Sequence, residues 1–235
     1  MSYPNLRITT PLVRQAIILA AGRGERLRPL TDSRPKPLIE LAGRPLIDHH
    51  LDRLRQAGVT DCVVNIAYLG ALIAEHVGDG TRYGLRIRLS KEPEGALETG
   101  GGIRQALALL APGPFITVNA DIFCDFDFLT LPVTPRGLSH LVLIDNPPHH
   151  PAGDFSFEGD LVGNLLYPRF TFSGIAVHSP QLFPVTVENP RFPLAPLLRK
   201  AAANGLVTGQ IHRGQWFDIG TLRRLEEART AMATS

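Results

Sequence analysis

A short segment near the N-terminus, residues 13–38, most constrains what this chain can fold into. The apolar run Val13–Leu19 predicts a buried β-strand, and a turn that contains Gly22 and Gly24 follows it directly. Glycines let the backbone pass close to a ligand, and turned-in amide groups bind anions. In open α/β sheets, ligands bind beyond the carboxyl ends of the strands. The segment therefore predicts both an α/β fold and the position of an anion site within it.

Basic side chains around this turn indicate that the anion is a polyphosphate. Arg23, Arg26 and Arg28 lie in or directly after the turn, and Lys36 follows between two prolines. These prolines are predicted to hold the backbone around the lysine extended and so to direct its ammonium group. A surface turn without a ligand is the alternative, since the glycine spacing matches neither the dinucleotide-binding fingerprint nor the P-loop. The combination of turn and lysine favours a nucleoside triphosphate.

Short runs rich in valine and isoleucine alternate with segments of helical periodicity in the first half of the chain. The predicted strands are Val13–Leu19, Asp61–Ile66, Leu85–Leu89, Phe115–Val118, His140–Ile144, Phe170–Val177 and Val207–His212. The predicted helices are Leu46–Ala57, Leu69–Val77, Gly102–Leu110 and Leu222–Ala231. This alternation predicts a mostly parallel central sheet with helices on both faces. After Asp145 the pattern loosens, and the proline-rich residues 147–151 predict a loop or small lobe over the sheet edge.

Composition excludes several functional classes. The chain has 235 residues, 44% of them hydrophobic, and a formal net charge of +2, which suits one α/β domain with a sizeable core. Because the basic residues are scattered, we expect no nucleic-acid partner, and no apolar run is long enough to span a membrane. Residues 1–12 lack the apolar core of a signal sequence and are predicted to form a short extension. Cys62 and Cys124 lie in or beside apolar runs, which favours buried free thiols in a reducing cytoplasm over a disulfide.

Two aspartates that close apolar runs are candidate metal ligands. Asp121 follows a strand of buried type, and Asp218 lies directly before the last predicted helix. Carboxylates at the carboxyl edge of a sheet suit Mg²⁺, which prefers oxygen ligands and keeps substrate phosphates in its shell. For Asp218 the alternative is a cap of the final helix. Asp125 and Asp127 rank lower, because their alternation with phenylalanines indicates the start of a short helix.

Further polar segments are candidate substrate contacts. Residues 98–102, Glu-Thr-Gly-Gly-Gly, precede the helix predicted from Ile103, and the glycines would let a nucleobase lie close; a flexible hinge is the alternative. Asp154 would bind sugar hydroxyls, or is an ordinary turn residue. The pair His149-His150 lies in the proline-rich loop, where a mobile lid is favoured over a metal site. The pair His49-His50 lies on a predicted helix and is expected to be structural.

Together these residues resemble the sugar-1-phosphate nucleotidyltransferase family. The family signature, Leu-x-Ala-Gly-x-Gly-x-Arg-Leu with Pro-Lys-Pro downstream, is matched by residues 19–27 and 35–37. The resemblance covers nearly the whole chain after residue 12. It implies a Rossmann-like nucleotidyltransferase fold with a small sugar-binding lobe, built as a single domain over residues 13–235. The nucleotide-binding half would span about residues 13–121 and the sugar-binding half about residues 122–235.

The resemblance also implies roles for individual residues. Arg26, Lys36 and Asp121 would be catalytic, and Mg²⁺, the implied cofactor, would be held by Asp121 and Asp218. The nucleotide would be bound by Ala20, Ala21, Gly22, Gly24, Glu25, Arg26, Lys36, Gly101 and Asn119. The sugar 1-phosphate would be bound by Glu98, Asn146, Asp154 and Ser173. Because a carboxylate beside phosphate is unfavourable, Glu25 would bind through its backbone amide.

Within the family, residues 97–102, 145–150 and 153–155 are most similar to the uridylyltransferases that act on N-acetylmuramate 1-phosphate in bacterial peptidoglycan recycling. The resemblance therefore implies uridylyl transfer from UTP to that sugar 1-phosphate by a cytoplasmic monomer or simple homodimer. Two other substrate pairs are alternatives within the class: mannose 1-phosphate with GTP, and glucose 1-phosphate with UTP or dTTP. The first is also suggested by Glu92-Pro93, which resembles the corresponding segment of the guanylyltransferases. A non-catalytic nucleotide-binding module is the alternative from another class. The glycine spacing disfavours a dehydrogenase.

Overall fold

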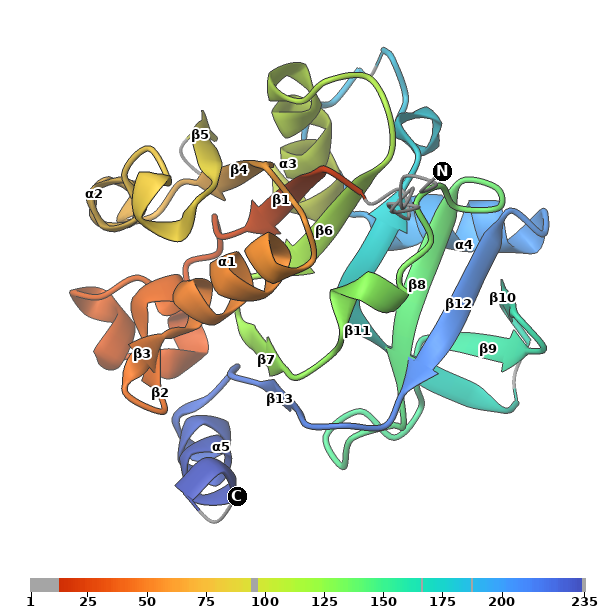
Figure 1. Cartoon of the computed structure of the whole chain (residues 1–235). Coiled ribbons are helices and arrows are strands. Elements are labelled where there is room, and N and C mark those ends of the chain that lie inside the picture. The colour runs from red at the N-terminus through yellow and green to blue at the C-terminus, as the bar shows by residue number, and fades with distance from the viewer. Residues whose placement is uncertain (1–12, 94–96, 166, 187, 234–235) are drawn as a thin grey trace, which may run out of the picture.

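The chain folds around a nine-stranded mixed sheet, shown in the computed structural model of Figure 1. The structure describes residues 13–93, 97–165, 167–186 and 188–233, so the predicted extension, residues 1–12, lies outside the described residues. In spatial order, the strands of the sheet are β5 (Arg86–Lys91), β4 (Asp61–Ile66), β1 (Gln15–Leu19), β6 (Phe115–Asn119), β11 (Arg169–His178), β8 (Ser139–Ile144), β12 (Val207–His212), β10 (Leu161–Gly163) and β9 (Phe155–Glu158). Two small ribbons pair β2 (Glu40–Leu41) with β3 (Arg44–Pro45) and β7 (Ile122–Cys124) with β13 (Trp216–Asp218). The α-helices are α1 (Leu46–Gln56), α2 (Gly70–Val77), α3 (Glu98–Ala106), α4 (Ala195–Ala203) and α5 (Leu222–Ala233).

The large sheet combines parallel and antiparallel pairings. Strands β5, β4, β1 and β6 run parallel, as the alternation of strands and helices predicts. Strand β11 is antiparallel to both β6 and β8, and the β9–β10 hairpin adds antiparallel strands beyond β12. The α/β class is confirmed, and the sheet is parallel mainly in its first half. Because the strand order reverses between β1 and β6, the carboxyl ends of these two strands border a crevice of the kind that binds ligands.

Helices cover both faces of the sheet, as predicted, because side chains alternate along each strand. Along β1, Ala16 and Ile18 enter a core that also contains residues of α1 and α2. Ile17 points to the opposite face and enters a core with residues of α3 and α4. The parallel strands are therefore buried on both sides, which is why they appear in the sequence as nearly continuous apolar runs.

The C-terminal helix α5 packs beside the turn that follows β1. Its residues Leu225 and Ala228 share a buried cluster with Leu27 from the turn, Phe123 from β7 and Ile219 directly after β13. Figure 1 shows α5 next to the β7–β13 ribbon, on the side away from the nine-stranded sheet. Through this cluster, α5 packs both against the segment after β1 and against the strand that ends in Asp218.

All seven predicted strands are present, each with both ends within two residues of the prediction. The structure adds short strands, two to four residues long, and helix α4, which the sequence did not indicate. Strands of this length are too short to show a periodic pattern. The segment after Asp145 contains the β9–β10 hairpin at the sheet edge. The short helix expected near Asp125 and Asp127 is the 3-10 helix Phe128–Thr130, which Asp127 caps.

Two further expectations concern the cysteines and the membrane. Cys62 and Cys124 are free and buried, as predicted, and burial raises the pKa of each thiol to about 12. Such thiols are unreactive at neutral pH. Over the part of the chain that the structure describes, every helix is too short or too polar to cross a membrane.

Two buried histidines should make the fold sensitive to acid. His178 contacts the hydroxyls of Thr117 and Ser139, at 3.0 and 2.8 Å, and His50 contacts the carbonyl oxygen of Ile122 at 2.8 Å. Burial lowers the pKa of His178 to about 3 and that of His50 to about 4, from an ordinary 6.5. The unfolded chain therefore takes up protons first as the pH falls below 6.5, and the folded state loses stability relative to it.

We expect the free energy of unfolding to fall by roughly 2–3 kcal/mol between about pH 7.5 and about pH 5.5, since each histidine contributes up to about 1.4 kcal/mol per pH unit. Urea unfolding followed by circular dichroism at several pH values measures this slope. In the variant His178→Gln the slope should be about half as steep, because only one of the two groups remains. An unchanged slope in that variant would contradict the assignment.

Candidate active site

Three adjoining cavities lie beyond the carboxyl ends of β1 and β6. The loop cavity, about 220 Å³, is lined by residues that include Ala20, Ala21, Gly22, Lys36, Asn65 and Glu92. The carboxylate cavity, about 420 Å³, is lined by residues that include Arg26, Asp121, Ser173, Trp216, Asp218 and Arg224. The apolar cavity, about 220 Å³, is lined by residues that include Thr99, Asp154, Phe172, Leu194, Leu198 and Arg199. Asn119 at the end of β6 lines all three, so the cavities adjoin one another, and together they are called the cleft below.

The turn after β1 brings its backbone to the edge of the loop cavity. Gly24 has a φ of +66°, a left-handed conformation that favours glycine. A Cβ atom there would lie 3.1 Å from Cγ2 of Thr31 and 3.3 Å from Cβ of Lys36, so the turn also needs glycine for close packing. A Cβ at Gly22 would meet no atom within 4 Å, which leaves open space for a ligand on that side. The predicted glycine turn, called the anion turn below for the ligand that it is predicted to bind, is therefore present, and Lys36 packs against it.

The three arginines of this turn have different positions. Arg26 lines the carboxylate cavity. Arg23 lies over the ring of Tyr68, 5.1 Å from its centroid, and Arg28 forms an ion pair with Asp32 at 3.2 Å. Of the three arginines only Arg26 lines one of the cavities, so contacts of Arg23 and Arg28 with a polyphosphate stay a prediction. Cation–π stacking and a local ion pair occupy those two side chains.

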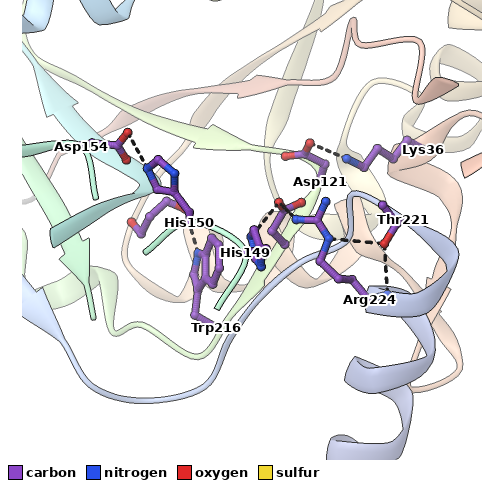
Figure 2. A network of polar contacts seen from close by, with 10 residues as sticks. Lys36, Asp121, His149, His150, Asp154, Trp216, Thr221 and Arg224 are labelled. Atoms are coloured by element: carbon purple, nitrogen blue, oxygen red, sulfur yellow. Dashed lines mark hydrogen bonds and ion pairs between the residues drawn. The ribbon is translucent and has the colours of Figure 1, made fainter. Parts of the chain in front are cut away.

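Lys36 reaches the cleft by a different backbone geometry from the one predicted. Pro35 is extended, but residues 36–38 form a 3-10 turn, so the expected extended backbone around the lysine is wrong. The tight turn buries the aliphatic stem and leaves Lys36 only 7% exposed. Its Nζ donates to Oδ2 of Asp121 at 2.5 Å, from one side of the cleft to the other (Figure 2).

A buried chain of hydrogen bonds, which the sequence analysis missed, holds the loop cavity together. The amide of Ala20 donates to Oδ1 of Asn65 at 2.5 Å, and Nδ2 of Asn65 donates to Oε1 of Glu92 at 2.6 Å. The other carboxylate oxygen of Glu92 accepts from the amide of Leu97 at 2.7 Å. Burial raises the pKa of Glu92, and these donors compensate part of that cost. The sequence contained one hint of this chain: Asn65 and Glu92 are polar residues at the carboxyl ends of β4 and β5.

The three consecutive glycines have a packing role that differs from the prediction. Helix α3 begins at Glu98, not near Ile103, so the glycines lie inside its first turns. A Cβ at Gly100 would lie 2.6 Å from the ring of Phe192, and one at Gly101 would lie 2.1 Å from the carbonyl oxygen of Pro190. A Cβ at Gly102 would lie 2.4 Å from Oε1 of Glu92. The missing side chains of these glycines therefore leave room for other segments of the protein, which pack against α3 where the nucleobase was predicted to lie.

Gly101 in particular is not placed to contact a nucleotide. Its amide donates to the carbonyl oxygen of Phe192 at 3.0 Å, and it lies outside the three cavities. Glu98, three residues before Gly101, does line the loop cavity. Glu98 has a φ of +59°, a strained conformation for a residue other than glycine, and such strain is concentrated at functional sites.

The two predicted metal ligands meet in the carboxylate cavity. Asp121 lies directly before β7 and Asp218 closes β13, and the amide of Ile219 donates to the carbonyl oxygen of Asp121 at 2.9 Å. The β7–β13 ribbon thus brings together two residues from distant parts of the sequence. Their side chains are 41% and 24% exposed, so a cation and solvent have access to both. Two carboxylates that face one cavity offer only oxygen donors, a set that fits Mg²⁺.

Cations of the chain itself pair with both carboxylates. Lys36 donates to Asp121, and Arg224 from α5 donates to Asp218. His149 lies 3.6 Å from Asp218, but burial and the neighbouring Arg224 lower its pKa, so it is neutral near pH 7. The amide of Arg224 donates to Oγ1 of Thr221 at 3.3 Å, and this makes Thr221, not Asp218, the cap of α5. Figure 2 shows Lys36 beside Asp121, and Arg224 extending from α5 toward His149.

Some of the residues predicted to bind the sugar phosphate line the cleft, while another is used in packing. Ser173 is buried at the carboxylate cavity, and its carbonyl oxygen accepts from Nε1 of Trp216 at 2.9 Å. Asp154 lines the apolar cavity, with one carboxylate oxygen 3.0 Å from Nε2 of His150. Its other oxygen accepts from the amide of Phe172 at 2.8 Å. The pair His149-His150 therefore contacts aspartates at the wall of the cleft.

Asn146 has a structural position, which corrects its predicted contact with the sugar. Its Nδ2 donates to the carbonyl oxygens of Pro151 and Arg169, at 3.1 and 3.0 Å, and its Oδ1 accepts from Oγ1 of Thr171 at 2.9 Å. These bonds tie the proline-rich loop to β11. Asn146 lies outside the three cavities.

Gly24 and Glu25 of the turn also lie outside the three cavities, and the side chain of Glu25 is 69% exposed and directed toward Arg23. Their predicted contacts would have to be made by the backbone. By contrast, Ala20, Ala21, Gly22, Lys36, Asn119 and Asp121 all line the loop cavity, as the prediction requires. Most of the predicted nucleotide residues thus line the cleft, while Gly24, Glu25 and Gly101 lie outside its three cavities.

Comparisons with known proteins agree with this arrangement. Residues 15–154 match the model of the nucleotidyl transferase family. The chain is 48% identical, over 92% of its length and 96% of the relative's, to an N-acetylmuramate alpha-1-phosphate uridylyltransferase of Neisseria meningitidis serogroup B. It is 35% identical, over 93% of its length and 97% of the relative's, to a protein of the same name from Caulobacter vibrioides.

The fold is also similar to that of HddC from Yersinia pseudotuberculosis, solved in complex with GMP-PN. The TM-score is 0.75 at 19% identity, and the alignment covers 93% of this chain and 99% of that one. This likeness concerns the fold, while the family match, over residues 15–154, includes the residues that line the loop cavity. With its anion turn, Lys36 and the paired aspartates in place, the chain belongs to the nucleotidyl transferase family.

Proposed function

We propose that this chain transfers a uridylyl group from UTP to N-acetylmuramate 1-phosphate, giving UDP-N-acetylmuramate and pyrophosphate. The observation that carries the proposal is the convergence of Lys36, Asp121 and Asp218 on one cleft beside the anion turn. The choice of substrates is supported by the names of the two sequence relatives, each of which aligns with more than nine-tenths of this chain. The reaction would serve peptidoglycan recycling in the cytoplasm.

The proposed chemistry is a direct in-line displacement. A phosphate oxygen of the sugar 1-phosphate attacks the α-phosphorus of UTP, a new P–O bond forms, and the bond to the departing pyrophosphate breaks. Because a phosphate dianion is already a competent nucleophile near pH 7, no side chain has to remove a proton. Catalysis then depends on positioning two anions and on neutralising the charge between them.

Each part of the cleft would have one task in this reaction. The turn at Ala20–Gly22 and the cation Lys36 would bind the triphosphate, and Arg26 would face the phosphates from the carboxylate cavity. Mg²⁺, held by Asp121 and Asp218, would supply further positive charge to the phosphates of both substrates. Lys36 and Arg224, which pair with these aspartates in the structure, would then be available to phosphate oxygens.

A matrix of nucleotides and sugar phosphates tests the proposal. Pyrophosphate release is measured with UTP, GTP and dTTP against the 1-phosphates of N-acetylmuramate, N-acetylglucosamine, mannose and glucose, and products are identified by mass spectrometry. We expect kcat/KM for UTP with N-acetylmuramate 1-phosphate to exceed every other pair by at least about tenfold, the discrimination that about 1.4 kcal/mol provides. Preference for GTP with mannose 1-phosphate, or nucleotide binding without turnover, would contradict the proposal. Sedimentation would show whether the active species is a monomer or a dimer.

A further inference from the structure

The apolar cavity has no task in the chemistry of phosphate transfer. It shares Thr99 and Asn119 with the loop cavity and Phe172 with the carboxylate cavity, so it opens next to the place where the sugar would lie. Its wall is largely apolar, with Phe155 and Leu194 among its members, and it has a volume of about 220 Å³. This is room for a substituent of a few heavy atoms.

One cation, from helix α4, lines this cavity. Arg199, an exposed residue of α4, lines it, and among the residues that the structure describes no carboxylate forms an ion pair with its guanidinium group. Elsewhere in the cleft, Lys36 and Arg224 are paired with the two metal-ligand candidates. The carboxylate of Asp154, in the same cavity, is occupied by His150 and the amide of Phe172. Arg199 is therefore available to an anionic group of a ligand.

An apolar wall with one free guanidinium suits a substituent that carries a methyl group and a carboxylate together. N-acetylmuramate differs from N-acetylglucosamine by such a group, a lactyl ether at C3. We infer that the apolar cavity receives the lactyl group of the sugar, with its methyl on the apolar wall and its carboxylate on Arg199, so that this arginine selects N-acetylmuramate over N-acetylglucosamine. The inference rests on the proposed function and names the residue that determines its sugar specificity.

The size of the expected effect follows from the chemistry of the contact. A hydrogen bond between charged partners contributes about 1.5–3 kcal/mol, so its loss should lower kcat/KM for the lactyl substrate by about tenfold to a hundredfold. A sugar without the carboxylate makes no such contact, so its kcat/KM should stay within about threefold of the wild-type value.

Steady-state kinetics with two sugars test the inference. For the wild type and the variant Arg199→Gln, kcat/KM is measured with UTP and the 1-phosphates of N-acetylmuramate and N-acetylglucosamine. The ratio of the two values should fall about tenfold to a hundredfold in Arg199→Gln, and Arg199→Lys should restore part of it. The matched control is Lys200→Gln, which removes the neighbouring exposed cation of α4 from outside the cavity and should leave the ratio unchanged.

Each contrary outcome has a distinct meaning. If the wild type prefers N-acetylmuramate 1-phosphate and Arg199→Gln keeps that preference, or loses activity equally toward both sugars, this inference is wrong and the proposed function stands. If the wild type turns over neither sugar phosphate, the proposed function fails and the inference fails with it. Melting temperatures, measured for all variants, separate a loss of folding from a loss of specificity.

Discussion

Substitution of Asp121 or Asp218 by asparagine is expected to lower kcat by about a hundredfold to a thousandfold, the cost of removing one preorganised charge contact from a reaction centre. Asparagine keeps the shape of each side chain but removes its charge, so the cavity would hold a divalent cation more weakly. The measurement is pyrophosphate release at saturating substrates over a range of Mg²⁺ concentrations. Both variants should need more Mg²⁺ for half-maximal rate, and chelation should abolish the activity of the wild type.

The matched control for these variants is Asp125→Asn. Asp125 follows β7 directly and its Oδ1 lies 2.8 Å from Nε2 of His212, but it lies outside the carboxylate cavity. Its substitution should change kcat by no more than about threefold, as expected for a partly exposed pair. Near-wild-type activity in both Asp121→Asn and Asp218→Asn would show that the metal assignment is wrong.

Replacement of Lys36 by methionine should have an effect of similar size, about a hundredfold or more in kcat. Methionine matches the buried stem of the lysine, so the packing against Gly24 is kept while the ammonium group is lost. The substitution removes the contact with Asp121 at 2.5 Å, and with it the positive charge that would face the triphosphate in the proposed function. Because Asp121 is 41% exposed, water can solvate its carboxylate after the change, and stability should fall little.

Arg34→Met provides the comparison for this prediction. Arg34 lies two residues before Lys36, is exposed, and forms an ion pair with Glu40 at 3.2 Å. Removing its charge should leave kcat within about threefold, since exposed ion pairs contribute little. Equal losses of activity in the two variants would mean that general charge near the turn, not the position of Lys36, supports the reaction. Binding of UTP, measured by calorimetry, would be weakened only in Lys36→Met.

Much of the candidate site could be predicted because its residues lie at the ends of strands. Apolar runs predict strands, and the carboxyl ends of neighbouring parallel strands meet at one edge of a sheet. The turn after β1, Asn119 at the end of β6 and Asp121 just beyond it follow this rule. Asp218 is a candidate for the same edge because it closes an apolar run and lies directly before the last predicted helix. The structure brings it there through the β7–β13 ribbon, whose strands are too short to show a pattern.

Other parts of the site depend on contacts that no local pattern contains. Arg26 and Arg28 look equivalent in the sequence, yet one lines the cleft and the other pairs with Asp32. The hydrogen bonds from Ala20 through Asn65 to Glu92 join the ends of three strands, and each member alone resembles an ordinary polar residue. Which donor meets which acceptor depends on distances in space, which are set only when the strands pair.

The sequence by itself determined the α/β class, the anion turn and the identity of the metal-ligand candidates, because hydrophobic periodicity and glycine turns are properties of neighbouring residues. The tertiary structure decided how these groups are used. It placed Lys36 on Asp121 and Arg224 on Asp218, filled the space beside Gly101 with another segment of the chain, and placed the exposed Arg199 at an apolar cavity. The physical reason is that ion pairing, burial and cavity shape arise between segments far apart in the chain, and these contacts exist only after the sheet and its helices have packed.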